Sequence, residues 1–177
     1  ISILNRLGFI LIIIHGGGKR ISNKLSEAGI KSNFINGLRI TDSKSINIVE
    51  EVLTTFNKEI TDALEKKSCD TTNITSKINN ILLVEQEKKE LGFVGTPIEI
   101  NKSIIENIIK EKKVPVIAPL GLDENKQVYN INADEVAGSI AKKLIARRLI
   151  IMSEVEGVLD KNKNLIPEIN TKIIEEL

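Results

Sequence analysis

The chain has 177 residues, with 25 lysines and arginines against 24 aspartates and glutamates, so its formal net charge is only +1. This balance removes the electrostatic basis for a dedicated nucleic-acid or membrane-surface binder. Hydrophobic residues make up 41% and charged residues 28% of the chain, which is ordinary globular usage rather than the composition of a disordered segment. We therefore expect a single folded domain over residues 1–177, built around one hydrophobic core.

Cysteine and histidine each occur once, as Cys69 and His15. A lone cysteine excludes an intramolecular disulfide and the usual zinc sites with two or four cysteines, so no protein metal site is expected. The longest apolar run, residues 9–14, is far shorter than the roughly 20 residues of a membrane span. It also lacks the flanks of a signal peptide, and the sequence therefore indicates a cytoplasmic protein.

Apolar segments with distinct periods open the chain. Residues 9–14 form a continuous β-branched run, which is typical of a strand buried on both faces of a parallel sheet. A helix over residues 20–28 should follow and end at Gly29. After a turn at Asn36-Gly37, a long helix is expected.

That long helix should begin at a cap formed by Ser43 or Ser45. Its apolar residues recur at steps of three and four, which predicts one face packed on the core. These positions are Ile46, Val49, Val52, Leu53, Phe56, Ile60 and Leu64.

The second half alternates strands and helices more regularly. Residues 68–92 give a weak pattern, interpreted as a short strand over 81–84 and a hairpin whose charged tip is 85–90, with no site assigned. The elements expected after it are a strand over 94–100, a helix over 103–112, a strand over 114–118, a polar turn at 123–126, a helix over 132–146 and a strand over 149–152. This alternation predicts an α/β fold, a three-layer αβα sandwich with a mostly parallel open sheet, whose ligands bind beyond the carboxyl ends of the strands.

A glycine-rich turn, His15-Gly16-Gly17-Gly18, stands between a predicted strand and a predicted helix. Its backbone N–H groups can converge on an anion, and the missing side chains let a phosphate approach. Three better-known motifs do not fit: a P-loop needs Ser or Thr where Arg20 stands, a dinucleotide fingerprint needs glycine where Ile21 stands, and an esterase needs a G-x-S-x-G elbow. The alternative is a turn that merely closes a strand–helix connection, with His15 as a buried hydrogen-bonding residue and not a catalyst.

Arg39 lies in the segment Gly37-Leu-Arg-Ile-Thr-Asp42, just ahead of the long helix. A guanidinium can grip a carboxylate with two parallel hydrogen bonds, which a lysine cannot do. The competing interpretation is a surface ion pair between Arg39 and Asp42 or a nearby glutamate.

Two amides and a carboxylate alternate in Tyr129-Asn-Ile-Asn-Ala-Asp134. Asn132 or Asp134 as an ordinary helix N-cap explains part of this pattern. It does not explain Asn130, whose amide should point to the same side as that of Asn132 because the lead-in is extended.

Six segments, in their order along the chain, resemble the N-acetylglutamate kinases of the amino-acid-kinase family. They are His15-Gly-Gly-Gly18, Asn36-Gly-Leu-Arg-Ile-Thr-Asp42, Leu91-Gly-Phe-Val-Gly95, Pro115-Val-Ile-Ala-Pro119, Tyr129-Asn-Ile-Asn-Ala-Asp134 and Gly157-Val-Leu-Asp160. The resemblance implies an open αβα sandwich. It also implies phosphorylation of the side-chain carboxylate of N-acetyl-L-glutamate to N-acetylglutamyl 5-phosphate, the second step of arginine biosynthesis, by ATP with Mg²⁺ carried by the nucleotide.

The resemblance also implies roles for individual residues. Gly16 and Gly17 correspond to glycines that contact substrate and phosphate, and Arg39 corresponds to the residue that holds the substrate α-carboxylate. Asn130 and Asn132 correspond to amides beside the substrate, and Asp134 to the catalytic-site carboxylate that orients lysines. Ser153 and Glu154 correspond to residues at the ATP end of the site. The chain departs from the family at Lys19 and Arg20, where Pro-Glu is usual, and at Glu154, where Asp is common.

Both catalytic lysines of the family lie in segments that have no counterpart here, and the only methionine is Met152. We therefore expect a domain that is incomplete at both termini, poorly soluble and inactive alone. The resemblance implies a homo-oligomer, a dimer or a hexamer, with N-acetyl-L-glutamate and ATP as partners and no nucleic acid or membrane. Two alternatives stay open: a related kinase for aminoadipate or a carrier-bound amino acid, and a catalytically dead binding or regulatory subunit.

Overall fold

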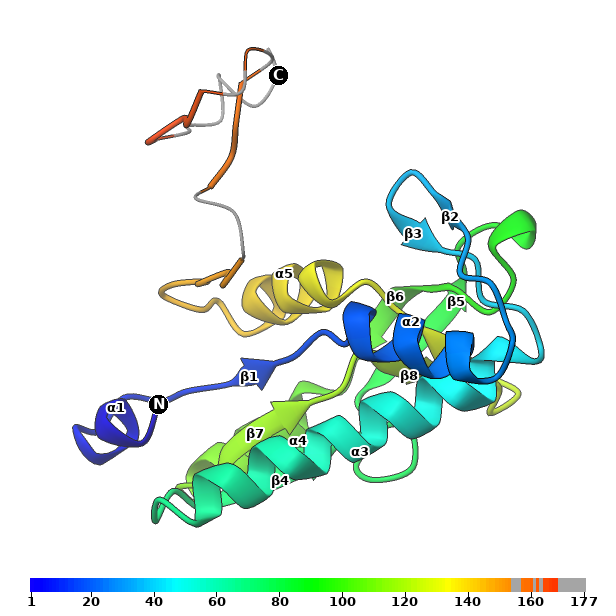
Figure 1. The fold of residues 1–177 in the computed structure, drawn as a ribbon. Coiled ribbons are helices and arrows are strands. Elements are labelled where there is room, and N and C mark those ends of the chain that lie inside the picture. Colours follow the sequence, from blue (N-terminus) through cyan, green and yellow to red (C-terminus); the bar gives the residue numbers. More distant parts are fainter. Residues whose placement is uncertain (154–156, 161, 163, 169–177) are drawn as a thin grey trace. The chain divides into compact units, whose positions relative to one another are not determined.

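The computed structural model describes residues 1–153, 157–160, 162 and 164–168. Two compact units, Ile1–Arg147 and Arg148–Leu177, are described separately, and the expectation of a single domain stays a prediction. The larger unit contains these elements (Figure 1): α1 (Ser2–Arg6), β1 (Ile13–Ile14), α2 (Gly18–Glu27), β2 (Phe34–Ile35), β3 (Leu38–Arg39), α3 (Ser45–Glu65), β4 (Thr71–Ile74), β5 (Leu82–Gln86), the 3₁₀ turn η1 (Lys89–Leu91), β6 (Gly95–Ile100), α4 (Lys102–Lys110), β7 (Val114–Ile117), β8 (Leu120–Leu122), β9 (Val128–Asn130) and α5 (Ala133–Lys143).

A parallel sheet in the order β1-β7-β4 forms the centre of the larger unit. Ile13 and Ile14 of β1 pair with the end of β7, and all four residues of β4 pair with β7. A second sheet, in the order β6-β5-β8-β9, is antiparallel except for the pair β5 and β8. The α/β fold with a parallel sheet is confirmed, and the second sheet is an addition that the sequence pattern did not predict.

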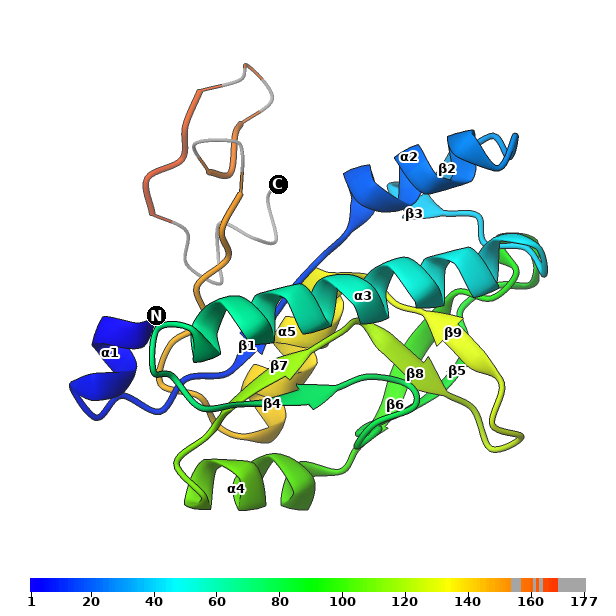
Figure 2. The same cartoon turned by 60° about the horizontal axis from the view of Figure 1, so that its bottom comes forward.

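Helices cover both faces of the parallel sheet because successive side chains of a strand point to opposite sides. In β7, Val116 belongs to a cluster with Leu64 of α3, whereas the next residue, Ile117, packs with Ile105 of α4 and Val136 of α5. Figure 2 shows α3 and α4 on opposite sides of β4 and β7. The three-layer arrangement is therefore the one expected.

The first strand is shorter than predicted. Only Ile13–Ile14 are paired, while Phe9 and Ile10 are 58% and 72% exposed. β1 is the edge of its sheet, so in the described part of the chain no neighbour covers its other side. A longer strand needs neighbours to satisfy its backbone N–H and C=O groups, and the apolar run alone does not supply them.

The strand predicted over residues 149–152 is wrong. These residues belong to the smaller unit and have no ladder partner, and Ile150 and Met152 are 76% and 92% exposed. Apolar composition favours a strand only where a second strand satisfies its backbone groups, and none of the described residues does so. Among the described helices, none is both long enough and apolar enough to cross a lipid bilayer.

Helix α2, the first one predicted, and the hairpin after it agree with their sequence signals, whereas α1 was not predicted. Gly29 has φ +72°, and the N–H of Ile30 donates to the carbonyl of Leu25 at 2.8 Å, which closes the end of α2. Asn36 and Gly37 have φ +49° and +81° and join β2 to β3 as a tight two-residue loop.

The long helix has a different cap from the one predicted. Neither Ser43 nor Ser45 caps α3; instead the Asp42 carboxylate accepts hydrogen bonds from the backbone N–H groups of Lys44 and Ser45 at 3.1 and 2.8 Å. Hydrogen bonds from Ser45 lower the pKa of Asp42. Asp42 is exposed, so a carboxylate fits this position without a desolvation penalty.

The weak region contains one more strand than expected. Its hairpin is confirmed, because β5 and β6 pair antiparallel around the exposed charged tip. The strand that was missed is β4, whose sequence Thr-Thr-Asn-Ile has only one aliphatic residue. The predicted polar turn joins the unpredicted hairpin of β8 and β9, where Asp123 Oδ1 accepts the N–H groups of Asn125 and Gln127 at 2.8 Å.

Candidate functional site

One hollow of about 180 Å³ brings together most of the predicted site residues. The glycine turn enters it after β1, Arg39 from β3, and Asn130 and Asn132 from the connection between β9 and α5. Pro119, just beyond the end of β7, also lines it. The hollow therefore lies beyond the carboxyl ends of two parallel strands, where α/β sheets bind ligands.

The three glycines of the turn have different structural roles. A Cβ on Gly17 would lie 2.7 Å from Cδ2 of Leu53, a core residue of α3, so any other residue there would force the packed Leu53 side chain to shift. A Cβ on Gly16 would lie 3.9 Å from the Cβ of Ala133, an ordinary contact inside the hollow, and one on Gly18 would meet nothing within 4 Å. The turn thus closes the strand–helix connection at Gly17 and leaves room for a ligand at Gly16.

The turn also presents the N-terminus of α2, whose N-cap is Gly17. The first N–H groups of a helix lack intrahelical partners and carry a partial positive charge. Among the described residues, no acceptor is found for the N–H groups of Gly16, Gly17 and Gly18. The arrangement can therefore bind an anion such as a phosphate.

Arg39 is buried, with 7% of its surface exposed. Its Nη1 donates to Ser32 Oγ, and its Nη2 donates to the Gly18 carbonyl at 2.9 Å and to Ser22 Oγ at 2.8 Å. The guanidinium also lies over the ring of Phe34, 4.7 Å from its centroid. Arg39 is thus fixed against the start of α2.

No acidic side chain of the described residues forms an ion pair with Arg39, and Asp42 caps α3 instead. The surface ion pair considered from the sequence is therefore wrong. Burial lowers the pKa of Arg39, but a guanidinium stays protonated. A buried cation with only neutral partners favours an anionic ligand beside it.

Thr41 links the arginine strand to the asparagines; it lies in the segment Asn36–Asp42, but the sequence assigned it no role. Its side chain is fully buried, and its Oγ1 donates to the carbonyl of Arg39 at 3.0 Å. Asn130 Nδ2 lies 3.4 Å from the same hydroxyl. The backbone of Gly92, with φ +71°, packs so closely against the Thr41 carbonyl that a side chain would collide with it. Thr41 can be recognised only from the fold.

Asn132 is the N-cap of α5, because its Oδ1 accepts the N–H of Asp134 at 2.9 Å. Both Asn130 and Asn132 line the hollow, as the alternation predicted. Asp134 is exposed and does not line it, and its catalytic role stays a prediction. Within the described ranges, no group of three or more His, Cys, Asp and Glu side chains could hold a metal ion.

The residues predicted at the ATP end lie in the smaller unit. Ser153 is exposed there, and Glu154 falls outside the described residues. Their roles in nucleotide binding stay predictions. His15, in contrast, is buried and hydrogen-bonded, as expected.

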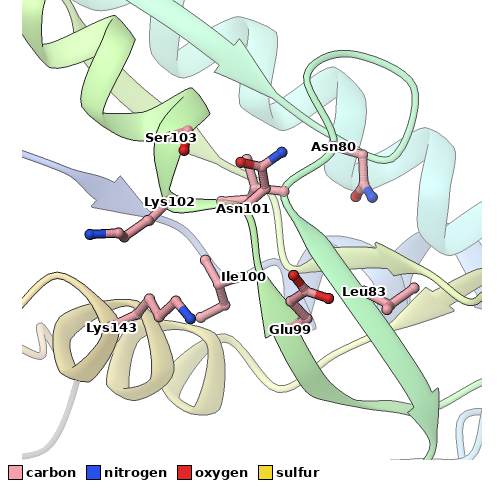
Figure 3. A pocket seen from close by; sticks show the side chains of 9 residues that line it. Asn80, Leu83, Glu99, Ile100, Asn101, Lys102, Ser103 and Lys143 are labelled. Atoms are coloured by element: carbon pink, nitrogen blue, oxygen red, sulfur yellow. The ribbon is translucent and has the colours of Figure 1, made fainter.

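A larger hollow, of about 520 Å³, lies at the start of α4 (Figure 3). Its cations are Lys102 and Lys143, and Figure 3 shows Lys143 extending from α5 toward Ile100. The Lys102 side chain is 51% exposed and pairs with Glu106 at 3.2 Å. The glycine turn and Arg39 contribute nothing to this hollow, so we assign the site by its chemistry and not by its volume.

Comparisons with known proteins agree with this geometry. The whole chain, residues 1–177, matches the profile of the Amino acid kinase family. It is 63% identical to the acetylglutamate kinase of Pelagibacter ubique over 177 residues, and 41% identical to that of Campylobacter fetus over 179 residues. The matches cover all of this chain but 62% and 64% of those proteins, so the chain spans less than two thirds of their length.

Two solved structures share the fold. The crystal structure of smu.665 from Streptococcus mutans has a TM-score of 0.90 at 30% identity, covering 97% of this chain and 71% of that one. An N-acetylglutamate synthase from Neisseria gonorrhoeae, complexed with coenzyme A and L-arginine, has a TM-score of 0.82 at 18% identity, covering 99% of this chain and 43% of that one. The second likeness concerns the fold alone.

Proposed function

This chain belongs to the amino acid kinase family, and we propose that the protein containing it is an acetylglutamate kinase. Such an enzyme transfers the γ-phosphoryl group of ATP to the side-chain carboxylate of N-acetyl-L-glutamate. The observation that carries the proposal is Arg39, a buried guanidinium that has no carboxylate partner among the described residues and lines the same hollow as the glycine turn. Carboxylate recognition and phosphate recognition are thereby adjacent.

The reaction brings two anions together, so positioned donors and cations must do most of the work. A bond forms between a substrate carboxylate oxygen and the γ-phosphorus as the bond from that phosphorus to the bridging oxygen breaks, and ADP leaves. In our assignment Arg39 holds the α-carboxylate, and the amides of Asn130 and Asn132 orient the rest of the substrate. The N–H groups of the glycine turn stabilise the negative charge on the transferring group.

Two further groups complete the proposal. Asp134, in the first turn of α5, would orient cationic groups around the phosphoryl, because a carboxylate both attracts and aligns ammonium groups. ATP would arrive with Mg²⁺, which prefers phosphate oxygens and water to an all-protein cage. We propose that the enzyme is a cytoplasmic homo-oligomer, a dimer or a hexamer, to be tested by light scattering on the purified protein.

The test is a coupled ADP-release assay on the complete protein with N-acetyl-L-glutamate, N-acetyl-L-aminoadipate and a carrier-bound glutamate as acceptors. We expect turnover with N-acetyl-L-glutamate and at least tenfold less with the other two. A preference for either of the others would assign the related kinase. Substrate binding by calorimetry without any turnover would assign a dead binding or regulatory subunit, and no binding at all would contradict the proposal.

A further inference from the structure

Asn57 is a polar residue in the apolar face of α3, and its side chain is fully buried. Its Nδ2 group donates to the Val116 carbonyl at 2.9 Å and lies 3.2 Å from Nε2 of His15. Its Oδ1 is buried and, among the described residues, has no partner. A buried amide with an unpaired oxygen costs stability, which suggests a role other than packing.

The neighbours of His15 specify one tautomer. Its Nδ1 lies 2.9 Å from the Gly16 carbonyl, which can only accept, so Nδ1 must carry the proton. In a neutral ring Nε2 is then an acceptor, which matches the N–H of Asn57. Turning the Asn57 amide round would place its oxygen against two acceptors, Nε2 and the Val116 carbonyl, so its orientation is determined as well.

This tautomer bears directly on the glycine turn. In a trans peptide the C=O and the N–H point in opposite directions, and the structure contains no cis peptide in its described residues. With the Gly16 carbonyl directed at the buried ring, the N–H of Gly17 points away from it. Gly16 and Gly17 both line the hollow, so the orientation of one peptide group affects the site.

We propose that Asn57 and His15 are positioning residues, which orient the Gly16–Gly17 peptide group so that the N–H of Gly17 serves the anion site. The importance of this orientation for phosphoryl transfer rests on the proposed function, whereas the orientation of the peptide group does not depend on it. Neither side chain lines the hollow, so both act through the backbone. The sequence contains no motif that pairs them, because they lie 42 positions apart.

The surroundings keep the ring neutral. The His15 ring meets Phe56 edge-on, 5.1 Å between centroids, and Arg20 lies over the same phenylalanine and pairs with Glu59 at 2.8 Å. Burial lowers the pKa of His15, and the charge of Arg20 lowers it further, against the opposing effect of the Gly16 carbonyl. A neutral imidazole can donate at one nitrogen and accept at the other, as this chain of contacts requires.

The tautomer can be measured directly, because His15 is the only histidine of the chain. We expect a long-range ¹H–¹⁵N spectrum of the histidine-labelled chain at pH 7 to show a protonated Nδ1 and an unprotonated Nε2. A ring protonated at Nε2, or one averaging between the two forms, would overturn the proposal. This measurement needs no variant and no enzymatic activity.

Variants test whether the tautomer moves the turn. Asn57→Asp places a carboxylate beside Nε2, so that nitrogen should become protonated and the pKa of the ring should rise. Above that raised pKa the proton should leave Nδ1, so the Gly16 carbonyl should lose its donor and the amide shifts of Gly16, Gly17 and Gly18 should change. Lowering the pH should restore the original shifts, because the doubly protonated ring donates at Nδ1 again. Asn57→Leu, which removes the donor without adding charge, should leave the ring in a mixture of tautomers.

The matched control is Thr61→Val. Thr61 is also buried and one turn further along α3, but its hydroxyl donates within the helix, to the Lys58 carbonyl at 2.8 Å. It should leave the histidine spectrum and the three glycine shifts unchanged. Unchanged glycine shifts in an Asn57→Asp chain whose ring carries its proton on Nε2 would overturn the positioning role.

The complete protein then separates the two proposals. If it phosphorylates N-acetyl-L-glutamate, Asn57→Asp should reduce kcat about 10²-fold, recover activity at lower pH and leave the KM for N-acetyl-L-glutamate within about threefold. If Asn57→Asp and Thr61→Val lost activity equally, the loss would reflect lower stability alone and would overturn the inference. If the complete protein has no kinase activity, the proposed function fails, while the tautomer and the glycine shifts still decide the inference.

Discussion

Two hollows in the larger unit each combine the start of a helix with a cation, and they differ in how the cation is held. At the start of α2, Arg39 is 7% exposed and fixed by three oxygen acceptors. At the start of α4, Lys102 is half exposed and pairs with a neighbour one turn away. The second hollow is larger, but only in the first are donors held in place before a ligand arrives. Preorganised donors are what an anion site requires.

The largest effect is expected at Asp134, which does not line the first hollow but follows Ala133, which does. Asp134→Asn should reduce turnover of the complete enzyme by about 10²–10³-fold, because the cationic groups around the phosphoryl lose their counter-charge. Stability should fall by only about 1 kcal/mol or less, because Asn132, and not Asp134, caps α5. Turnover and melting temperature should be measured on one preparation; near-normal turnover would leave Asp134 as a helix-start carboxylate.

Arg39→Lys should weaken binding of N-acetyl-L-glutamate by about 1–3 kcal/mol, or roughly 5- to 150-fold, because a lysine keeps the charge but loses the planar fork. The contacts of Arg39 with Gly18 and Ser22 of α2 add a second expectation. The nucleotide affinity should fall as well, by a smaller factor, because the start of α2 loses its support. Calorimetric titration with each ligand measures both; an unchanged acetylglutamate affinity would contradict the assignment.

The glycines separate binding from packing. Gly17→Ala should destabilise the chain by about 1–3 kcal/mol because its Cβ collides with Leu53. Gly16→Ala should cost little stability, since its Cβ meets only an ordinary contact, but should weaken phosphate binding. Gly18→Ala is the control, with open space around its Cβ. Denaturant unfolding and nucleotide titration of all three variants test this order.

The pH dependence of stability tests the buried ring of His15. Burial holds the pKa of His15 in the folded chain below its ordinary value of 6.5, so the unfolded chain binds the proton more readily. The contribution of His15 to the free energy of unfolding is therefore complete above about pH 6.5. It declines as the pH falls, by at most about 1.4 kcal/mol per pH unit.

The control for this pH effect is His15→Gln. Burial and the nearby Glu87 raise the pKa of Glu135 above 4.5, which has the opposite sign because stability is then lost as the pH rises. Subtracting the unfolding free energies of His15→Gln from those of the unmodified chain between pH 5 and 8 isolates the histidine. A difference that does not change with pH would contradict the assigned burial.

Local signals predicted much of the first hollow. The Asn36-Gly37 dipeptide predicts its tight turn because both residues tolerate positive φ, and the alternation of Asn130 and Asn132 places both at the same hollow. Thr41 and Asn57 could not be predicted, because their partners lie 89 and 42 positions away. Such contacts depend on the tertiary fold and leave no local pattern.

The failed strands have the same cause. Residues 149–152 and 9–12 have the composition of strands, but no strand of the described chain pairs with them. β4 has the opposite composition and is nevertheless a strand, because β7 lies beside it and pairs with all four of its residues. Pairing, which composition does not encode, decided all three segments.

The smallest effects are expected from substitutions of the two lysines that line the second hollow. Lys102→Met and Lys143→Met should each change stability by less than about 0.5 kcal/mol, since exposed lysines and a surface pair contribute little. Neither should change the affinity for ATP or N-acetyl-L-glutamate, because the hollow they line contains no residue of the glycine turn. Titration of both variants beside Arg39→Lys is the direct comparison. The lysine variants could instead lose as much anion binding as the arginine variant. Positive charge near a helix start would then suffice for anion binding, and burial and fixed geometry would not distinguish the two hollows.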